Sequence, residues 1–191
     1  MKSLNIWEIK AELDGFLLPE IEKKGQILLE SKWGTPLLRQ WNKYGVNFLN
    51  DYGEKKTDFH FILGFIPIIS ERIASFFPFK TCDVELLPVK NTSGENFFIV
   101  NPCFCDSRIL NKRKSKIRYD VEGQISWISE PVFFYLPPKI LFKIPDMPTK
   151  IYADETFVSI VRKYKFQGID FIPRKIKKQS LVSRIIEVIY G

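Results

Sequence analysis

The side chains of this chain that could do acid–base chemistry are a single histidine and two pairs of carboxylates. His60 lies between two phenylalanines in an almost wholly apolar run, which predicts a histidine in the core or at its boundary. Asp83 and Glu85 are two residues apart, so in a strand they would share a face and could act as acid and base. Asp154 and Glu155 open a predicted helix, whose dipole favours negative charge there. The second pair therefore has a structural explanation.

The chain carries no glycine-rich pattern of the kind that binds phosphates or dinucleotides. The sequence predicts no catalytic residue and no cofactor. An enzyme in which Asp83, Glu85 and His60 line one cleft is a third alternative, after the two binding functions described below.

The three cysteines, Cys82, Cys103 and Cys105, predict neither a disulfide framework nor a metal site. Their odd number and irregular spacing argue against paired disulfides. Cys103 and Cys105 would share a face of a strand, but zinc needs four ligands, and the chain offers only one further Cys and one His. We expect small buried thiols in a reducing compartment.

Neither a secretion signal nor a membrane span is predicted. Charged residues interrupt the first 15 positions, and the apolar run 59–69 is too short to cross about 30 Å of hydrocarbon. We expect a soluble cytoplasmic protein without membrane contact.

A basic run is the best candidate for binding. The formal net charge is +7, and an excess of positive charge attracts acidic protein surfaces and nucleic acids. Only one aromatic residue, Tyr119, lies beside the run, whereas single-stranded nucleic acid usually stacks on several. The sequence leaves three interpretations of the basic run open: a solvated loop, a binding site for an acidic protein partner, or a binding site for a nucleic acid. The six candidate partner-binding residues are Arg108, Lys112, Arg113, Lys114, Lys116 and Arg118.

A motif that occurs twice, at 68–90 and 151–175, is expected to form the framework around these residues. Each copy has a short apolar stretch, then a helix-capping residue, Ser70 or Asp154, followed by glutamate. An amphipathic segment and an extended run that contains proline complete each copy. Two similar strand–helix–strand units are predicted, and they would support a sheet rather than supply chemistry.

The remaining pattern predicts mostly short strands. An alternating run at 4–9, a segment at 26–30 and the runs 124–128, 132–136 and 140–144 favour strands. Turn residues at 91–95 predict an antiparallel hairpin between 84–89 and 97–100. Helical spacing follows a turn at 34–36, Asp14-Gly15 predicts another turn, and Ser180 could cap a final helix.

Together these elements predict an α+β fold with a mixed, mostly antiparallel sheet. A single domain is expected over 1–191, with a core at 58–175, an N-terminal extension at 1–57 and a basic C-terminal helix at 176–191.

The repeated motif resembles the immunity proteins of bacterial polymorphic toxin systems, in particular the myxobacterial-type immunity domain. Ile68-Ile69-Ser70-Glu71-Arg72-Ile73 and Val84-Glu85-Leu86-Leu87-Pro88-Val89 are similar to the family's first unit. Ile140-Leu141-Phe142-Lys143-Ile144 and Gln167-Gly168-Ile169-Asp170-Phe171 are similar to its ending. The resemblance implies a non-enzymatic protein that binds a cognate toxin domain and blocks it by stoichiometric occlusion. A basic nucleic-acid-binding module is the alternative.

Overall fold

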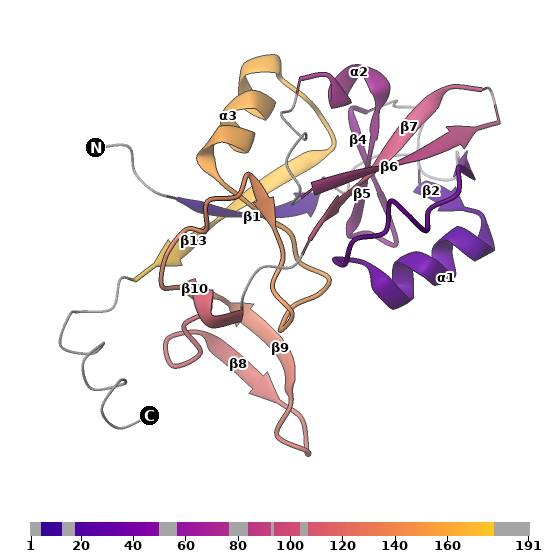
Figure 1. The fold of residues 1–191 in the computed structure, drawn as a ribbon. Coiled ribbons are helices and arrows are strands. Elements are labelled where there is room, and N and C mark those ends of the chain that lie inside the picture. The colour runs from indigo at the N-terminus through magenta and orange to yellow at the C-terminus, as the bar shows by residue number, and fades with distance from the viewer. Residues whose placement is uncertain are drawn as a thin grey trace.

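The computed structural model describes residues 5–12, 18–49, 57–76, 84–92, 94–103 and 107–177. Their fold is α+β, as predicted, with mostly antiparallel sheets (Figure 1). The predicted Asp14-Gly15 turn, residues Cys82, Asp83 and Cys105, and positions 178–191 of the predicted C-terminal helix lie outside the described ranges. The first residue of that predicted helix, Ile176, instead ends a strand.

The larger sheet has six strands in the order β2-β3-β6-β7-β5-β4. Neighbouring strands pair antiparallel except β3 and β6, which are parallel. The edge strands β2 and β4 contact each other, so the sheet is strongly curled. Its strands are β2 (Leu18–Ile21), β3 (Tyr44–Leu49), β4 (Phe59–Ile62), β5 (Ile66–Ser70), β6 (Val84–Asn91) and β7 (Asn96–Pro102).

The second sheet has five strands in the order β10-β13-β1-β12-β11. The N-terminal strand β1 pairs antiparallel with both β12 and β13, and only β10 and β13 are parallel. The sequence predicted one sheet, but the strands divide between these two and a small ribbon described below. The strands of this sheet are β1 (Ile6–Ala11), β10 (Val132–Phe133), β11 (Leu141–Phe142), β12 (Tyr152–Ala153) and β13 (Ile169–Ile176).

Each sheet contains one copy of the repeated motif. Helix α2 (Glu71–Ala74) stands between β5 and β6 in the chain, and α3 (Glu155–Tyr164) stands between β12 and β13. In both copies the two strands are parallel and are separated by one strand antiparallel to both. The predicted caps are present, because the side chains of Ser70 and Asp154 accept hydrogen bonds from the N–H groups three residues further on.

Helix α1 (Lys23–Lys32) replaces the strand that was predicted at 26–30. Its Gly25 and Leu29, four residues apart, are buried on one side. A short apolar run such as 27–29 does not distinguish strand from helix by its period, which explains the error.

The helix predicted after the turn at 34–36 is also absent. Residues 38–40 form turns and Tyr44 begins β3. The Glu85 carboxylate of β6 accepts hydrogen bonds from the N–H groups of Leu37 (2.6 Å) and Leu38 (3.1 Å). These tertiary bonds hold the segment in an irregular conformation against its helical spacing.

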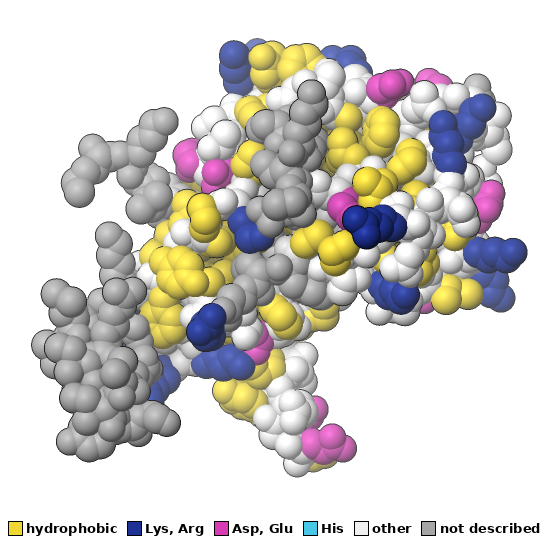
Figure 2. All heavy atoms as spheres, viewed as in Figure 1, with side chains coloured by type: hydrophobic (Ala, Val, Ile, Leu, Met, Phe, Trp, Pro, Cys, Tyr) yellow, Lys and Arg dark blue, Asp and Glu magenta, His cyan; other side chains and the backbone are white. Residues whose placement is uncertain are grey.

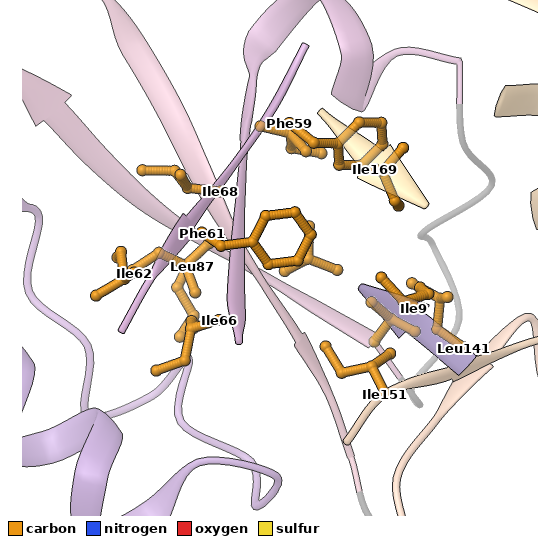
Figure 3. Packing of buried hydrophobic residues seen from close by; sticks show 14 of the residues in the cluster. Ile9, Phe59, Phe61, Ile62, Ile66, Ile68, Leu87, Leu141, Ile151 and Ile169 are labelled. Carbon is orange, nitrogen blue, oxygen red and sulfur yellow. The ribbon is translucent and has the colours of Figure 1, made fainter. Parts of the chain in front are cut away.

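One hydrophobic cluster joins the two sheets (Figure 3). Ile9, Leu141 and Ile151 face Phe61 of the six-stranded sheet in this view. A second cluster, which includes Ile128, lies beneath the ribbon. Its other buried members are Ile6, Ile109, Leu110, Phe133, Phe142, Ile144, Met147 and Tyr152.

Candidate partner-binding surface

A two-stranded antiparallel ribbon, β8 (Lys116–Tyr119) and β9 (Ile125–Glu130), projects from the body of the molecule (Figure 1). Ile117 and Ile128 lie opposite each other, and Ile128 is fully buried in the second cluster. At the far end, the Asp120 carboxylate accepts hydrogen bonds from the N–H groups of Glu122 (3.0 Å) and Gln124 (2.8 Å). The ribbon is therefore fixed both at its root and at its turn.

The segment before the ribbon is also folded. The N–H of Asn111 donates to the carbonyl of Val132 (2.8 Å), and the Asn111 side chain accepts from the N–H of Lys114 (3.2 Å). The Ser115 hydroxyl accepts from the N–H of Val132 (2.9 Å). Residues 107–119 thus form a short 3-10 helix (Ser107–Ile109), an anchored turn and strand β8, so the basic run is not a plain solvated loop.

All six predicted binding residues are exposed, but they differ in whether they form ion pairs. Lys112 forms an ion pair with Asp146 (2.7 Å), and Lys116 with Glu130 (2.5 Å). Arg113, Lys114 and Arg118 form no ion pair within the described part of the chain. The sixth residue, Arg108, lies in the 3-10 helix. The turn and β8 therefore present at least three cations to solvent.

Trp127 is the residue of this surface that sequence reasoning missed. It lies directly opposite Arg118 in the ribbon, and half of its surface is exposed (50%). The alternation of β9 was a usable signal, because a strand that buries Ile128 must turn its neighbour Trp127 away from that core. The two ends of the ribbon carry different types of side chain. Figure 2 shows hydrophobic side chains toward its root and acidic ones at its tip.

An ion triad of the five-stranded sheet lies beside the ribbon. Glu8 of β1 is buried (1% exposed) and binds Lys150 (2.6 Å) and Arg174, whose Nε lies 2.7 Å from its carboxylate. The Nζ of Lys150 lies 5.3 Å from the centre of the Trp127 ring. The triad thus connects the five-stranded sheet to the aromatic side chain of the ribbon.

The basic end of β13 also reaches this surface. The hydrogen bond from Lys116 lowers the pKa of the Glu130 carboxyl group, and the positive charges of Lys175 and Arg174 lower it further. These two segments are far apart in sequence. Glu130 therefore marks the place where the predicted basic run and the basic residues at the end of β13 come within electrostatic range of each other.

The acid–base candidates have structural roles. Glu85 accepts a third hydrogen bond, from the Asn101 side chain (3.0 Å), besides the two from the 37–38 backbone. His60 is buried, with its ring 4.8 Å from that of Phe48 and its Nδ1 3.5 Å from the Thr57 hydroxyl. The core environment predicted for His60 is confirmed.

A buried lysine is the most perturbed titratable group of the described residues. Lys143 is 0% exposed, and its Nζ lies 3.1 Å from the centre of the Trp33 ring. Burial lowers its pKa from 10.5 to about 6, although the neighbouring Cys103 opposes the shift. A neutral amine is nucleophilic, but this one is out of reach of a dissolved substrate.

No protein-family model matches the chain, and no curated protein matches it with significance. The resemblance to immunity proteins therefore rests on the motifs alone. Within the described ranges, no three His, Cys, Asp or Glu side chains are grouped so that they could hold a metal ion. None of the helices in those ranges is both long and apolar enough to cross a bilayer.

Proposed function

We propose that this protein is a cytoplasmic immunity protein, which binds one cognate toxin domain through the β8–β9 ribbon and blocks it by stoichiometric occlusion. The observation that carries the proposal is the juxtaposition of exposed Arg118 and exposed Trp127 on a fixed, projecting ribbon. Interface hot spots are enriched in tryptophan and arginine, and fixed side chains lose little entropy on binding. The resemblance of the repeated motif to immunity proteins is the reason for proposing a toxin domain as the partner.

In this proposal the two copies of the repeated motif are related units with a supporting role. Each places parallel strands around one antiparallel strand, and each begins its helix at a side-chain cap. The first copy belongs to the curled six-stranded sheet. The second contains β12 and β13, which pair with the strand that carries Glu8. The second unit lies next to the ribbon, since its Lys175 is within electrostatic range of Glu130. Both units leave binding to the exposed face of the ribbon.

The proposal is tested by co-expression with the products of the neighbouring genes. We expect that a toxin domain encoded next to this gene will arrest growth when it is expressed alone, and that this protein will restore growth and form a one-to-one complex with it. Failure to restore growth against every neighbouring product, with no complex on size-exclusion chromatography, would overturn the immunity function.

A nucleic-acid-binding function is the second candidate, and Trp127 is the observation that favours it. The sequence offered only Tyr119 near the basic run, whereas the ribbon carries two half-exposed aromatic side chains, Tyr119 and Trp127, beside its cations. Bases stack on such side chains with little sequence preference. Filter binding to unrelated RNA and DNA, repeated over a range of salt concentrations, distinguishes this function from the first.

A further inference from the structure

Exposed apolar side chains are concentrated in the segment that contains the ribbon. Of the eight large hydrophobic residues that are exposed in the described ranges, four lie between positions 119 and 135. Exposed apolar surface of this kind is a common feature of interaction sites. The four are Tyr119, Val121, Trp127 and Tyr135.

The part of the ribbon that carries Trp127 is fixed before any partner arrives. The register shifts beside Arg118 and beside Lys116 are bridged by side-chain hydrogen bonds: Ser126 donates to the carbonyl of Arg118 (3.0 Å) and Ser129 to that of Lys116 (3.4 Å). Lys150, held by Glu8, lies near the indole ring. A rigid aromatic anchor loses less conformational freedom on binding than a mobile one.

The charge around the indole is positive. Arg118 lies opposite Trp127, and the Nζ of Lys150 lies 5.3 Å from the centre of its ring. The nearby carboxylates are already used, because Glu130 binds Lys116 and Glu8 is buried between two cations. A partner surface that covers Trp127 must therefore bring negative charge to its rim.

The acidic tip favours a protein over a nucleic acid. Asp120 and Glu122 are exposed in the turn that directly follows β8. A phosphate backbone running along the ribbon would pass both carboxylates, whereas a discrete acidic patch on a protein can meet the cationic root and leave the tip in solvent.

We propose that Trp127 fills an apolar socket on the partner and that Arg118 pairs with a carboxylate at the rim of that socket. This inference rests on the proposed immunity function and specifies the surface of the toxin that is recognised. That surface is acidic. It is not a groove that binds a polyanion, because such a groove is itself basic and would repel Arg118 and its neighbours.

The test compares two pairs of substitutions against the co-expressed toxin domain. Trp127→Ala and Arg118→Ala remove the proposed anchor and its charge partner. Leu38→Ala and Arg39→Ala are matched controls, since Leu38 is exposed to the same degree (51%) and Arg39 is an exposed arginine away from the ribbon. Melting curves verify that each variant is folded, and calorimetry gives its dissociation constant.

We expect Trp127→Ala to weaken binding about 30-fold and Arg118→Ala about tenfold, as for hot-spot residues, with the controls unchanged. A photo-crosslinking residue at position 127 then labels an apolar segment of the toxin flanked by Asp or Glu. If folded Trp127 and Arg118 variants bind as tightly as wild type, the inference is overturned and the immunity function stands.

Two other outcomes would also overturn the inference. If wild-type protein neither binds nor neutralises a neighbouring product, the immunity function and the inference both fail. If a homopolymeric single-stranded oligonucleotide binds wild type at physiological salt and Trp127→Ala abolishes that binding, the ribbon is a nucleic-acid site and the protein-socket inference is overturned.

Discussion

Gly168 lies so close to the carbonyl oxygen of Phe59 that a Cβ atom at position 168 would come within 2.2 Å of that oxygen. This contact joins the two sheets, because Gly168 immediately precedes β13 and Phe59 begins β4. The N–H of Phe59 donates to the carbonyl of Gln167 (3.0 Å), and the N–H of Gly168 donates to Glu12 (3.1 Å). This contact between the two sheets therefore requires glycine at position 168.

Gly168→Ala is expected to destabilise the protein strongly. The φ of +91° already disfavours any other residue by about 1–2 kcal/mol, and the overlap with backbone adds to that cost. We expect a total loss of about 3 kcal/mol or more in the free energy of unfolding, measured by chemical denaturation. Gly123→Ala is the control, since Gly123 has a similar φ of +77° but nothing within 4 Å of the added atom. Equal losses in the two variants would show that the close approach is unimportant.

Glu8→Gln is expected to destabilise the protein. The substitution leaves the largely buried cations of Lys150 and Arg174 without their carboxylate, and breaking a buried ion pair costs about 3–5 kcal/mol. Glu130→Gln, which breaks the exposed pair with Lys116, should cost much less, because solvent screens an exposed ion pair. Thermal denaturation of both variants gives the comparison. A smaller loss for Glu8→Gln than for Glu130→Gln would contradict a stabilising role for the triad.

Lys143 is expected to make the stability of the protein depend on pH. Its pKa is about 6 in the folded protein and 10.5 when exposed, so between these values the unfolded chain binds a proton that the folded protein does not. Raising the pH within this window therefore stabilises the fold, by about 1.4 kcal/mol per unit from this one group.

Lys143→Met removes this contribution. We expect its free energy of unfolding to be higher than that of wild type at pH 7 and to rise less steeply between pH 6.5 and 8.5, a window that lies inside the two pKa values. Lys10→Met, at an exposed position of β1, should retain the wild-type slope. Parallel slopes for wild type and Lys143→Met in urea titrations would mean that Lys143 is charged in the folded protein.

The association rate with the toxin is expected to fall as salt is added. Raising ionic strength from 0.1 to 1 M shortens the Debye length from about 10 to about 3 Å, which screens the steering by the exposed cations. Stopped-flow mixing at several salt concentrations measures the rate, and Arg113→Ala with Lys114→Ala should reduce its slope. A rate that does not change with ionic strength would rule out electrostatic steering.

Helix starts and turns could be predicted where they depend on residues that are close together in the sequence. The capping oxygens of Ser70 and Asp154 begin α2 and α3, and the turn at 91–95 closes the predicted hairpin of β6 and β7. The predictions failed at 26–30 and at 37–44. In the first segment the apolar pattern was too short to identify a period, and in the second Glu85 of a distant strand fixed the backbone.

An α+β fold with two capped helices after short strands, and a concentrated positive charge at 108–118, could be predicted from the sequence, because caps, turns and charge depend on residues close together in the chain. The division of the strands into separate sheets and the pairing of Lys112 and Lys116 with acids are visible in the folded molecule alone. The same is true of the position of Trp127 opposite Arg118 and next to Lys150. Strand register and long-range ion pairs join residues far apart in the sequence, so which residues meet depends on how the whole core packs.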